Sequence, residues 1–440
     1  MNYILKNANL FDGTNNNDIQ ENMCVVVENG KIKSIKPSSE EIQEDYEIID
    51  LQGKYLLPGL INLHAHLFGT GKPSKSLGGG TMQKLLVKFI HTPLGKPVID
   101  SMVTKHITSA LNSGVTTIRS SGDFCFSDVR IRDKINSGEI IGPRLIVPGP
   151  AITCVGGHGD GTFAISNDDP NTLADYVKSH KEKGVDYIKI CVTGGVMDAK
   201  KKGEPGEVKM TLEQTKAVCD MAHKFGLKVA SHTESSKGIE VALDGGVDTV
   251  EHGSFLDENL VQKFKDNNSA FIVTTSPALP LAKLSPSITK LNEMCVYNSN
   301  VILDGMVNGA MDALKNNITV GLGTDASCPL VTPYDMWREV YYFAKFYGVS
   351  NAFAIHTATL VNAQILGIDN ITGSIEVGKE ADLIVVKENP IEDLKALRDV
   401  DMVMVGGKLI DSPKYERNEQ IDEWLNSLIN MKLKYGAMKN

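Results

Sequence analysis

The sequence predicts an α/β fold: a (β/α)8 TIM-like barrel beside a small β-sandwich domain that the N- and C-terminal segments form together. Three observations lead to this prediction. The middle of the chain alternates apolar strand runs with helical patterns, which is typical of a parallel sheet. The strand runs number eight and extend over about 300 residues, the size of a (β/α)8 barrel. Near both ends of the chain, short strands with turns occur instead.

Each expected strand is a short apolar run, and helical patterns such as those of residues 81–90 and 211–226 lie between the strands. Several of these helices end in Gly or Asn just before the next strand, which is a typical stop signal. The eight strands are expected at residues 57–66, 114–120, 144–153, 185–195, 227–234, 247–254, 269–277 and 318–327.

The chain divides into three predicted parts. Residues 58–365 form the barrel, and residues 1–57 plus 366–413 pair into the small β-sandwich domain. Residues 414–440 contain apolar residues at helical spacing and are expected to form a C-terminal helix that docks on the body. The glycine-rich segment 69–80 is interpreted as a flap over the end of the first barrel strand.

Composition excludes several classes of protein. The 440 residues carry a formal charge of −9, so neither a nucleic acid nor an anionic surface is an expected partner. No run is long and apolar enough to cross a bilayer, and the first residues lack the pattern of a signal peptide. The seven cysteines are dispersed and form no CxxC pair, which favours reduced thiols in a cytoplasmic protein.

Polar residues gather where the barrel strands end. In the first strand, Ile61, Leu63 and Ala65 share one face, while His64 and His66 share the other. Both faces of a parallel barrel strand are normally apolar, so this histidine face is unusual. It is expected to point into the barrel at the C-terminal rim, where barrel enzymes hold their active sites.

Four more polar residues follow the same rule. Lys189 is aimed inward on the fourth strand, and His232, His252 and Asp325 come at the ends of the fifth, sixth and eighth strands, although the alternation around His252 is not clean. Imidazoles and a carboxylate are suitable ligands for zinc or a similar ion. An ammonium group among metal ions would be repelled, but a neutral lysine amine can add carbon dioxide, and the resulting carbamate can bridge two metals.

With these motifs in place, the chain resembles the amidohydrolase superfamily over nearly its whole length. The motifs that carry the resemblance are PGLINLHAH, GVTTIRSSGD, YIKICVTGG, VASHTE, VEHGS, GLGTDAS and GSIEVGKEADLIVV. The run GPRLIVPGPAITCVGGHGD is similar to the branch of imidazolonepropionase-like hydrolases, Xaa-Pro dipeptidases and carboxypeptidases acting on C-terminal basic residues.

The resemblance implies a binuclear zinc site. His64, His66 and Asp325 would hold the more buried ion, His232 and His252 the other, and carboxylated Lys189 and a hydroxide would bridge them. The implied function is hydrolysis of an amide C–N bond by attack of that hydroxide. The implied substrate is a dipeptide, as for a prolidase or carboxypeptidase, or an N-acyl amino acid. Asp325 would take the proton from the nucleophile and pass it to the leaving amine.

Three residues are expected to contact the substrate. The resemblance suggests that His158 binds the substrate carboxylate, although an ordinary loop histidine fits the pattern equally well. The related peptidases often carry a tyrosine two residues after the fifth-strand histidine. Here that position is Glu234, which would repel a carboxylate and is expected to meet an amine or guanidinium, or solvent. Arg119 is predicted to contact an anion or to form a structural salt bridge.

Two other functions remain open. A deaminase of a small heterocycle would use one metal without the bridging lysine, and its glutamate follows the histidine in an HxxE pattern, whereas this chain has HxE. A catalytically inactive binding scaffold is the other alternative, but such a relative would usually have lost at least one ligand. We also expect the chain to assemble as a homo-oligomer.

Overall fold

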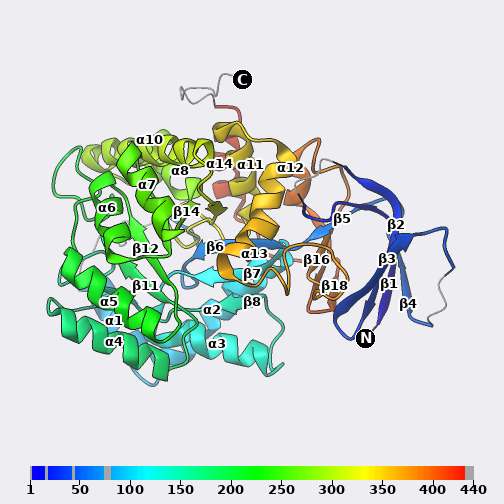
Figure 1. The fold of residues 1–440 in the computed structure, drawn as a ribbon, viewed down its shortest axis with the longest axis horizontal. Helices are drawn as coiled ribbons and strands as arrows, with labels where there is room; N and C mark the ends of the chain where they lie inside the picture. The colour runs from blue at the N-terminus through cyan, green and yellow to red at the C-terminus, as the bar shows by residue number, and fades with distance from the viewer. Residues whose placement is uncertain (1, 15–17, 42–44, 74–80, 432–440) are drawn as a thin grey trace.

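The computed structural model describes residues 2–14, 18–41, 45–73 and 81–431 (Figure 1). The strands are β1 (Tyr3–Leu10), β2 (Gln20–Glu28), β3 (Lys31–Pro37), β4 (Glu47–Asp50), β5 (Tyr55–Pro58), β6 (Leu60–Ala65), β7 (Val115–Ser120), β8 (Arg144–Ile146), β9 (Ala151–Thr153), β10 (Ala164–Ser166), β11 (Ile188–Cys191), β12 (Val229–Thr233), β13 (Thr249–His252), β14 (Ala270–Val273), β15 (Val320–Leu322), β16 (Leu383–Val386), β17 (Val400–Val405) and β18 (Lys408–Asp411).

The helices lie mainly around the strands of the middle segment (Figure 1). They are α1 (Thr81–Ile90), α2 (Gly95–Asn112), α3 (Ser127–Asn136), α4 (Pro170–Glu182), α5 (Leu212–Lys224), α6 (Ser236–Gly245), α7 (Glu258–Asn267), α8 (Thr275–Lys283), α9 (Pro286–Thr289), α10 (Glu293–Lys315), α11 (Met336–Tyr347), α12 (Asn351–His356), α13 (Asn362–Leu366) and α14 (Glu419–Leu428), with the short segments η2 (Phe124–Phe126), η3 (Thr357–Val361) and η4 (Leu394–Arg398).

The strands of the middle segment pair in parallel and form two sheets. One sheet has the order β10-β9-β11-β12-β13-β14-β15, and the other has the order β6-β7-β8. A parallel bridge between Ala65 and Ala326 joins the ends of β6 and β15, and the Asp325 N–H donates to the His64 carbonyl over 2.7 Å. The predicted mixed α/β fold with a separate sheet domain is confirmed, and this junction brings the first and last strands of the middle segment side by side.

The predicted strand 144–153 is two short strands in the structure. β8 pairs with β7, whereas β9 pairs with β10 and β11. Pro148 and Pro150 lie between them and have no N–H to donate to a ladder, while Gly149 has a positive φ of 69° that no regular strand adopts. The two sheets therefore part at this segment.

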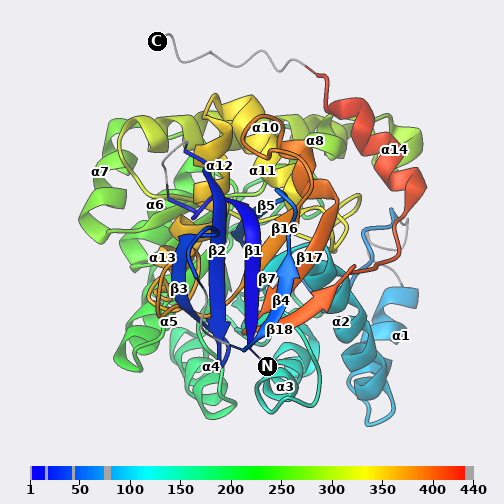
Figure 2. The same cartoon turned by 90° about the vertical axis from the view of Figure 1, so that its right-hand side faces the viewer.

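The N- and C-terminal strands form a separate sheet of eight strands, seven in the order β18-β17-β16-β5-β1-β2-β3 and the eighth, β4, paired with β1 outside this order (Figure 2). Antiparallel pairing of β5 with β16 joins the two ends of the chain. Strand β1 pairs with β4 along its first half and with β5 along its second half, on either side of the left-handed residue Asn7. The strands of the predicted β-sandwich domain thus form one hydrogen-bonded sheet that branches at β1.

Helix α14 packs its apolar side on the body of the molecule. Ile421, Leu425 and Leu428 are buried, and Arg338 of α11 contacts Asp422 over 3.1 Å. Residues 432–440 of the predicted C-terminal helix and residues 74–80 of the predicted flap lie outside the described residues. Within the described residues, no helix has both the length and the apolar character needed to cross a bilayer.

Candidate metal centre

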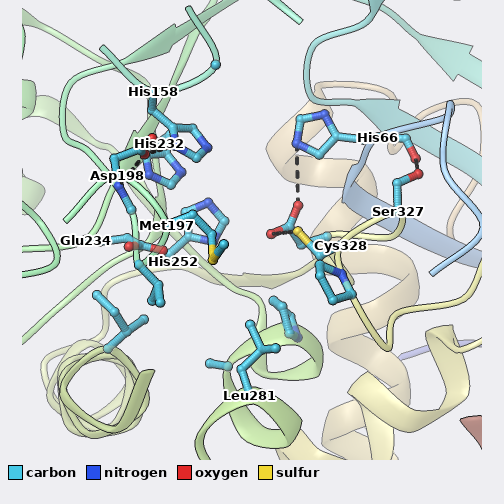
Figure 3. Close-up of a pocket in the computed structure, with 18 of the residues that line it drawn as sticks. His66, His158, Met197, Asp198, His232, Glu234, His252, Leu281, Ser327 and Cys328 are labelled. Atoms are coloured by element: carbon cyan, nitrogen blue, oxygen red, sulfur yellow. Dashed lines mark hydrogen bonds and ion pairs between the residues drawn. The ribbon is translucent and has the colours of Figure 1, made fainter. Parts of the chain in front are cut away.

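The predicted metal ligands surround one cavity of about 740 Å³ at the C-terminal ends of the strands of the middle segment. Figure 3 shows His158, His232, His252 and Glu234 on one side of this cavity and His66 and Cys328 on the other, with Leu281 below. The residues that the sequence placed on strands one, four, five, six and eight all line it: His64, His66, Lys189, His232, His252 and Asp325.

The first group comprises His64, His66 and Asp325. The Asp325 Oδ1 atom lies 3.2 Å from His64 Nε2 and 3.5 Å from His66 Nε2. His66 uses its other ring nitrogen, Nδ1, to contact the Gly122 carbonyl over 3.0 Å, so Nε2 is left to face the cavity. All three side chains offer ligand atoms that lie within 4.8 Å of one another, as a single ion requires.

Hydrogen bonds of the backbone and of the Asn62 side-chain amide hold the end of β15 against β6. The Asn62 Oδ1 atom accepts from the N–H groups of His64 and Thr324, and Asn62 Nδ2 donates to Thr324 Oγ1 over 2.8 Å. Gly323 passes so close to β6 that a Cβ atom there would lie 2.5 Å from His64 Cβ. Asn62 and Gly323 therefore set the separation of His64 and Asp325.

We expect Gly323→Ala to displace His64 and to lower the affinity of the first group for metal, because the added methyl overlaps the His64 backbone as well as its Cβ. Metal content per chain and the midpoint of thermal unfolding measure the effect. Gly194→Ala is the control, since its Cβ would meet its nearest neighbours at 3.3 Å. Equal metal content in Gly323→Ala and wild type would contradict this role of Gly323.

The second group comprises His232, Glu234 and His252, whose ligand atoms also lie within 4.8 Å of one another. His252 Nδ1 contacts Thr274 Oγ1 over 2.7 Å, which leaves His252 Nε2 free to face the cavity. The His252 ring lies 4.6 Å from the His232 ring and 4.8 Å from the His64 ring, centroid to centroid. The two groups are therefore neighbours.

Two ligands have a left-handed backbone, which non-glycine residues rarely adopt. The φ angle is 67° at His252 and 55° at Asp325. Such conformations cost about 1–3 kcal/mol each and cluster at functional sites. The left-handed conformation of His252 also interrupts the alternation of side chains along β13. The neighbours Glu251 and His252 therefore both face the interior, and the sequence pattern is irregular at this point.

The chemistry of the donors fits divalent metal ions. Burial lowers the pKa of His64 and of His66 to about 4 and lowers the pKa of His232 and His252 well below the usual value, so all four imidazoles are neutral and able to ligate. Although burial opposes it, the surrounding histidines hold the pKa of Asp325 well below its ordinary value. Among the described residues, His252 Nε2 and Glu234 Oε2 are buried without any hydrogen-bond partner, and an ion would satisfy both.

Lys189 lies beneath the two groups and is 2% exposed. Its Nζ atom contacts Oε2 of Glu251, which also lies 3.2 Å from His64 Nδ1. Burial lowers the pKa of Lys189 to about 7, so a neutral amine is accessible near physiological pH. The charge of Lys189 in turn lowers the pKa of histidines in both groups.

Arg119 forms a structural ion pair, the second of the two roles predicted for it. Its guanidinium donates to Glu251 Oε1 over 2.9 Å and to the Leu63 carbonyl over 2.8 Å, and it packs over the Tyr187 ring. Arg119 is not among the residues that line the cavity, so the predicted contact with a substrate anion is not supported. Glu251, which the sequence analysis did not single out, joins Arg119 and Lys189. A lone charged residue inside the run TVEH is the signal that could have found it.

His158 and Glu234 both line the cavity, as a contact with the substrate requires. The His158 Nδ1 atom contacts Asp198 Oδ2 over 2.5 Å, and the His158 ring stacks on His232 at 4.1 Å between centroids. Burial alone would raise the pKa of Asp198, but the contact with His158 lowers it below its ordinary value. Asp198 was missed in the sequence because it comes seven residues after the end of β11, in a stretch with no metal or catalytic motif.

The rest of the cavity wall is largely apolar. Residues of α8, the segment that follows it and α10 contribute to it, together with three phenylalanines. A substrate with an apolar group adjoining a polar bond to be cleaved fits such a wall. The apolar residues include Phe68, Phe124, Phe163, Pro277, Ala278, Leu281, Leu291, Met294, Ile302 and Met306.

The family of the chain is decided by comparison with known proteins. A model of the amidohydrolase family matches residues 55–410. The chain belongs to the amidohydrolase family. The resemblance inferred from the motifs is thereby confirmed, and this amidohydrolase is a hydrolase that acts on carbon–nitrogen bonds.

Relatives of this amidohydrolase include peptidases. A candidate prolidase from Bifidobacterium longum has a crystal structure that is 36% identical, with a TM-score of 0.85 over 97% of this chain and 98% of that chain. A Xaa-Pro dipeptidase with bound methionine in its active site is 30% identical, with a TM-score of 0.81 over 93% of this chain and 100% of that chain. Ochratoxinase from Aspergillus niger is 26% identical over 333 residues, which cover 69% of this chain and 67% of the relative.

Proposed function

We propose that this amidohydrolase uses two divalent metal ions, with zinc as the native metal, to hydrolyse an amide C–N bond in a dipeptide or an N-acyl amino acid. The observation that carries the proposal is that two groups of neutral imidazoles line one cavity, His64 and His66 with the carboxylate of Asp325, and His232 with His252. The Xaa-Pro dipeptidase and ochratoxinase relatives support the choice of an amide or peptide bond. We further propose that the two sheets of the middle segment constitute one distorted (β/α)8 barrel.

Lys189 would connect the two groups in this proposal. Its neutral Nζ attacks the carbon of carbon dioxide, an N–C bond forms and one proton leaves, so the side chain becomes a carbamate with two ligand oxygens. Glu251 would stay paired with Arg119 when Lys189 is modified, since the guanidinium donates to Oε1 independently of the lysine. The buried, unprotonated amine that this reaction needs is supported by the lowered pKa of Lys189.

Bound metal would polarise the scissile carbonyl and lower the pKa of a bound water toward neutrality. Asp325 then holds the proton that leaves the nucleophile, on its Oδ atoms, and delivers it to the departing amine. His158, oriented by Asp198, is placed to contact the substrate at the edge of the second group. The apolar wall formed by α8 and α10 would take an apolar side chain and exclude water from the bond.

Metal content per chain, measured by mass spectrometry after expression with zinc and bicarbonate, tests the proposal. We expect about two ions in wild type and fewer in Lys189→Ala, because both groups lose the shared carbamate. Lys202→Ala, which removes an exposed lysine paired with Glu293, is the matched control and should keep the wild-type content.

A panel of dipeptides and N-acyl amino acids then tests the reaction by release of the amine product. Hydrolysis of at least one of these classes by the two-metal protein supports the proposal. One ion per chain that is indifferent to Lys189, together with ammonia release from a small heterocycle, would overturn it in favour of a deaminase. A protein that binds no metal would overturn it in favour of a binding scaffold.

A further inference from the structure

We propose that Glu234 is a direct ligand of the metal ion held by His232 and His252, so that the second ion is bound by a carboxylate of the β12 end in addition to Lys189. This inference rests on the proposed two-metal function. It assigns Glu234 a role different from the contact with a substrate amine or guanidinium that the sequence suggested.

The position of the carboxylate supports ligation. A ligand oxygen of Glu234 lies within 4.8 Å of ligand nitrogens of both His232 and His252, which is the spacing of groups around a single ion. Two atoms of this trio, Glu234 Oε2 and His252 Nε2, are buried and make no hydrogen bond with any described residue. Figure 3 shows the Glu234 carboxylate on the same side of the cavity as His252 and His232. Two unpartnered atoms that lie close together on one side of the cavity indicate a missing partner for both.

The backbone around Glu234 is held firmly. Its N–H donates to Thr193 Oγ1 over 3.0 Å, and its carbonyl lies so close to Gly206 that a Cβ there would approach to 2.4 Å. Ser235 follows as the N-cap of α6, where its Oγ accepts from Gly238 N–H. Glu234 is therefore fixed between the end of β12 and the start of α6.

No cation of the described part of the chain pairs with Glu234. The nearby Lys189 and Arg119 are both engaged by Glu251. Two charges that act on Glu234, those of Asp325 and Asp198, are both negative. A carboxylate whose Oε2 atom is buried without a cation is costly, and a divalent ion at His232 and His252 would remove that cost.

The donor set matches known preferences of metal ions. Two imidazoles and one carboxylate form the protein ligands of several catalytic zinc sites. A carboxylate also adds negative charge beside the two neutral imidazoles of this group, in addition to the charge of the proposed Lys189 carbamate. Glu234 would thus strengthen binding of the second ion, while the first ion already has a carboxylate in Asp325.

The Glu234→Gln substitution tests the inference, because it keeps the size of the side chain and removes its charge and much of its ligand strength. We expect wild type to bind about two zinc ions per chain and Glu234→Gln about one, with the second dissociation constant raised about 100-fold or more. Asp160→Asn is the matched control: it removes a carboxylate from the same cavity that belongs to neither ligand group, and it should keep two ions.

The visible spectrum of the cobalt-loaded protein distinguishes direct ligation by Glu234 from an effect of its charge alone. The band of the second cobalt ion should be lost in Glu234→Gln and unchanged in Asp160→Asn. Glu234→His supplies a different ligand and should bind two ions with a shifted cobalt band, which also keeps the test decisive if Glu234→Gln fails to fold. Two ions with a wild-type cobalt spectrum in Glu234→Gln, or an unshifted band in Glu234→His, would overturn the inference. Fewer than two ions in wild type would instead overturn the proposed function.

Discussion

Replacement of Asp325 by Asn is expected to lower kcat about 10³-fold while the protein keeps much of its metal. The amide oxygen of Asn can still contact an ion, but the amide cannot take the proton that Asp325 would hold during amide hydrolysis. General acid–base groups contribute typically 10²- to 10⁴-fold to rate. The assay is hydrolysis of the best dipeptide or N-acyl amino acid, together with metal content per chain.

Asp160→Asn is the control for this substitution. Asp160 lines the same cavity but belongs to neither ligand group, and its carboxylate accepts from Gly156 N–H and Ser166 Oγ. It should leave kcat within a few fold of wild type. Full activity in Asp325→Asn would contradict the assigned proton transfer, whereas a complete loss of metal would show that Asp325 acts mainly as a ligand.

The substitution Glu251→Gln is expected to have the largest effect on stability. Glu251 is fully buried and contacts Arg119, Lys189 and His64 Nδ1, so its removal leaves a buried guanidinium without its ion pair. Breaking a buried ion pair from one side costs about 3–5 kcal/mol of unfolding free energy. We expect a value near the lower end, because Lys189 can lose its proton and become neutral. Denaturant unfolding of the chelator-treated protein measures the loss without the contribution of bound metal.

Two control substitutions test whether the loss of stability is specific to the buried ion pairs of Glu251. Arg119→Met leaves Glu251 in contact with Lys189, so it should cost less than Glu251→Gln. Glu416→Gln breaks an ion pair with Lys105 in which both side chains are more than 70% exposed, and it should change stability little. A Glu251→Gln protein as stable as Glu416→Gln would show that the buried network does not stabilise the fold.

Much of the fold follows from local pattern. Alternating strand and helix signals lead to the parallel strands from β6 to β15, and the strand signals near both ends correspond to the eight-stranded sheet joined by β5 and β16. The split of strand 144–153 at Pro148–Pro150 was open to prediction from the same rules, since two prolines with a glycine between them interrupt any ladder. The branching of the small sheet at β1 was not, because it depends on which strands pair with each half of β1.

The candidate metal ligands could be predicted from the sequence because they violate a strong expectation. Polar residues such as His64, Lys189 and His232 are rare in buried parallel strands, and their positions at strand ends place them at one rim. The first-strand motif alone identified the face that carries His64 and His66. Chemistry of this kind is encoded locally, since each residue needs only its own strand to be aimed inward.

The sequence by itself thus determined the parallel strands, the polar residues that meet in the cavity, and the family. Only the tertiary structure decided that Arg119 pairs with Glu251 instead of a substrate, that Asp198 orients His158, and that Glu234 joins His232 and His252. These relations join residues on different strands and loops, and at His252 the left-handed backbone reverses the direction that alternation would predict. Local periodicity specifies which face a residue occupies, but its partners are set by the packing of distant segments.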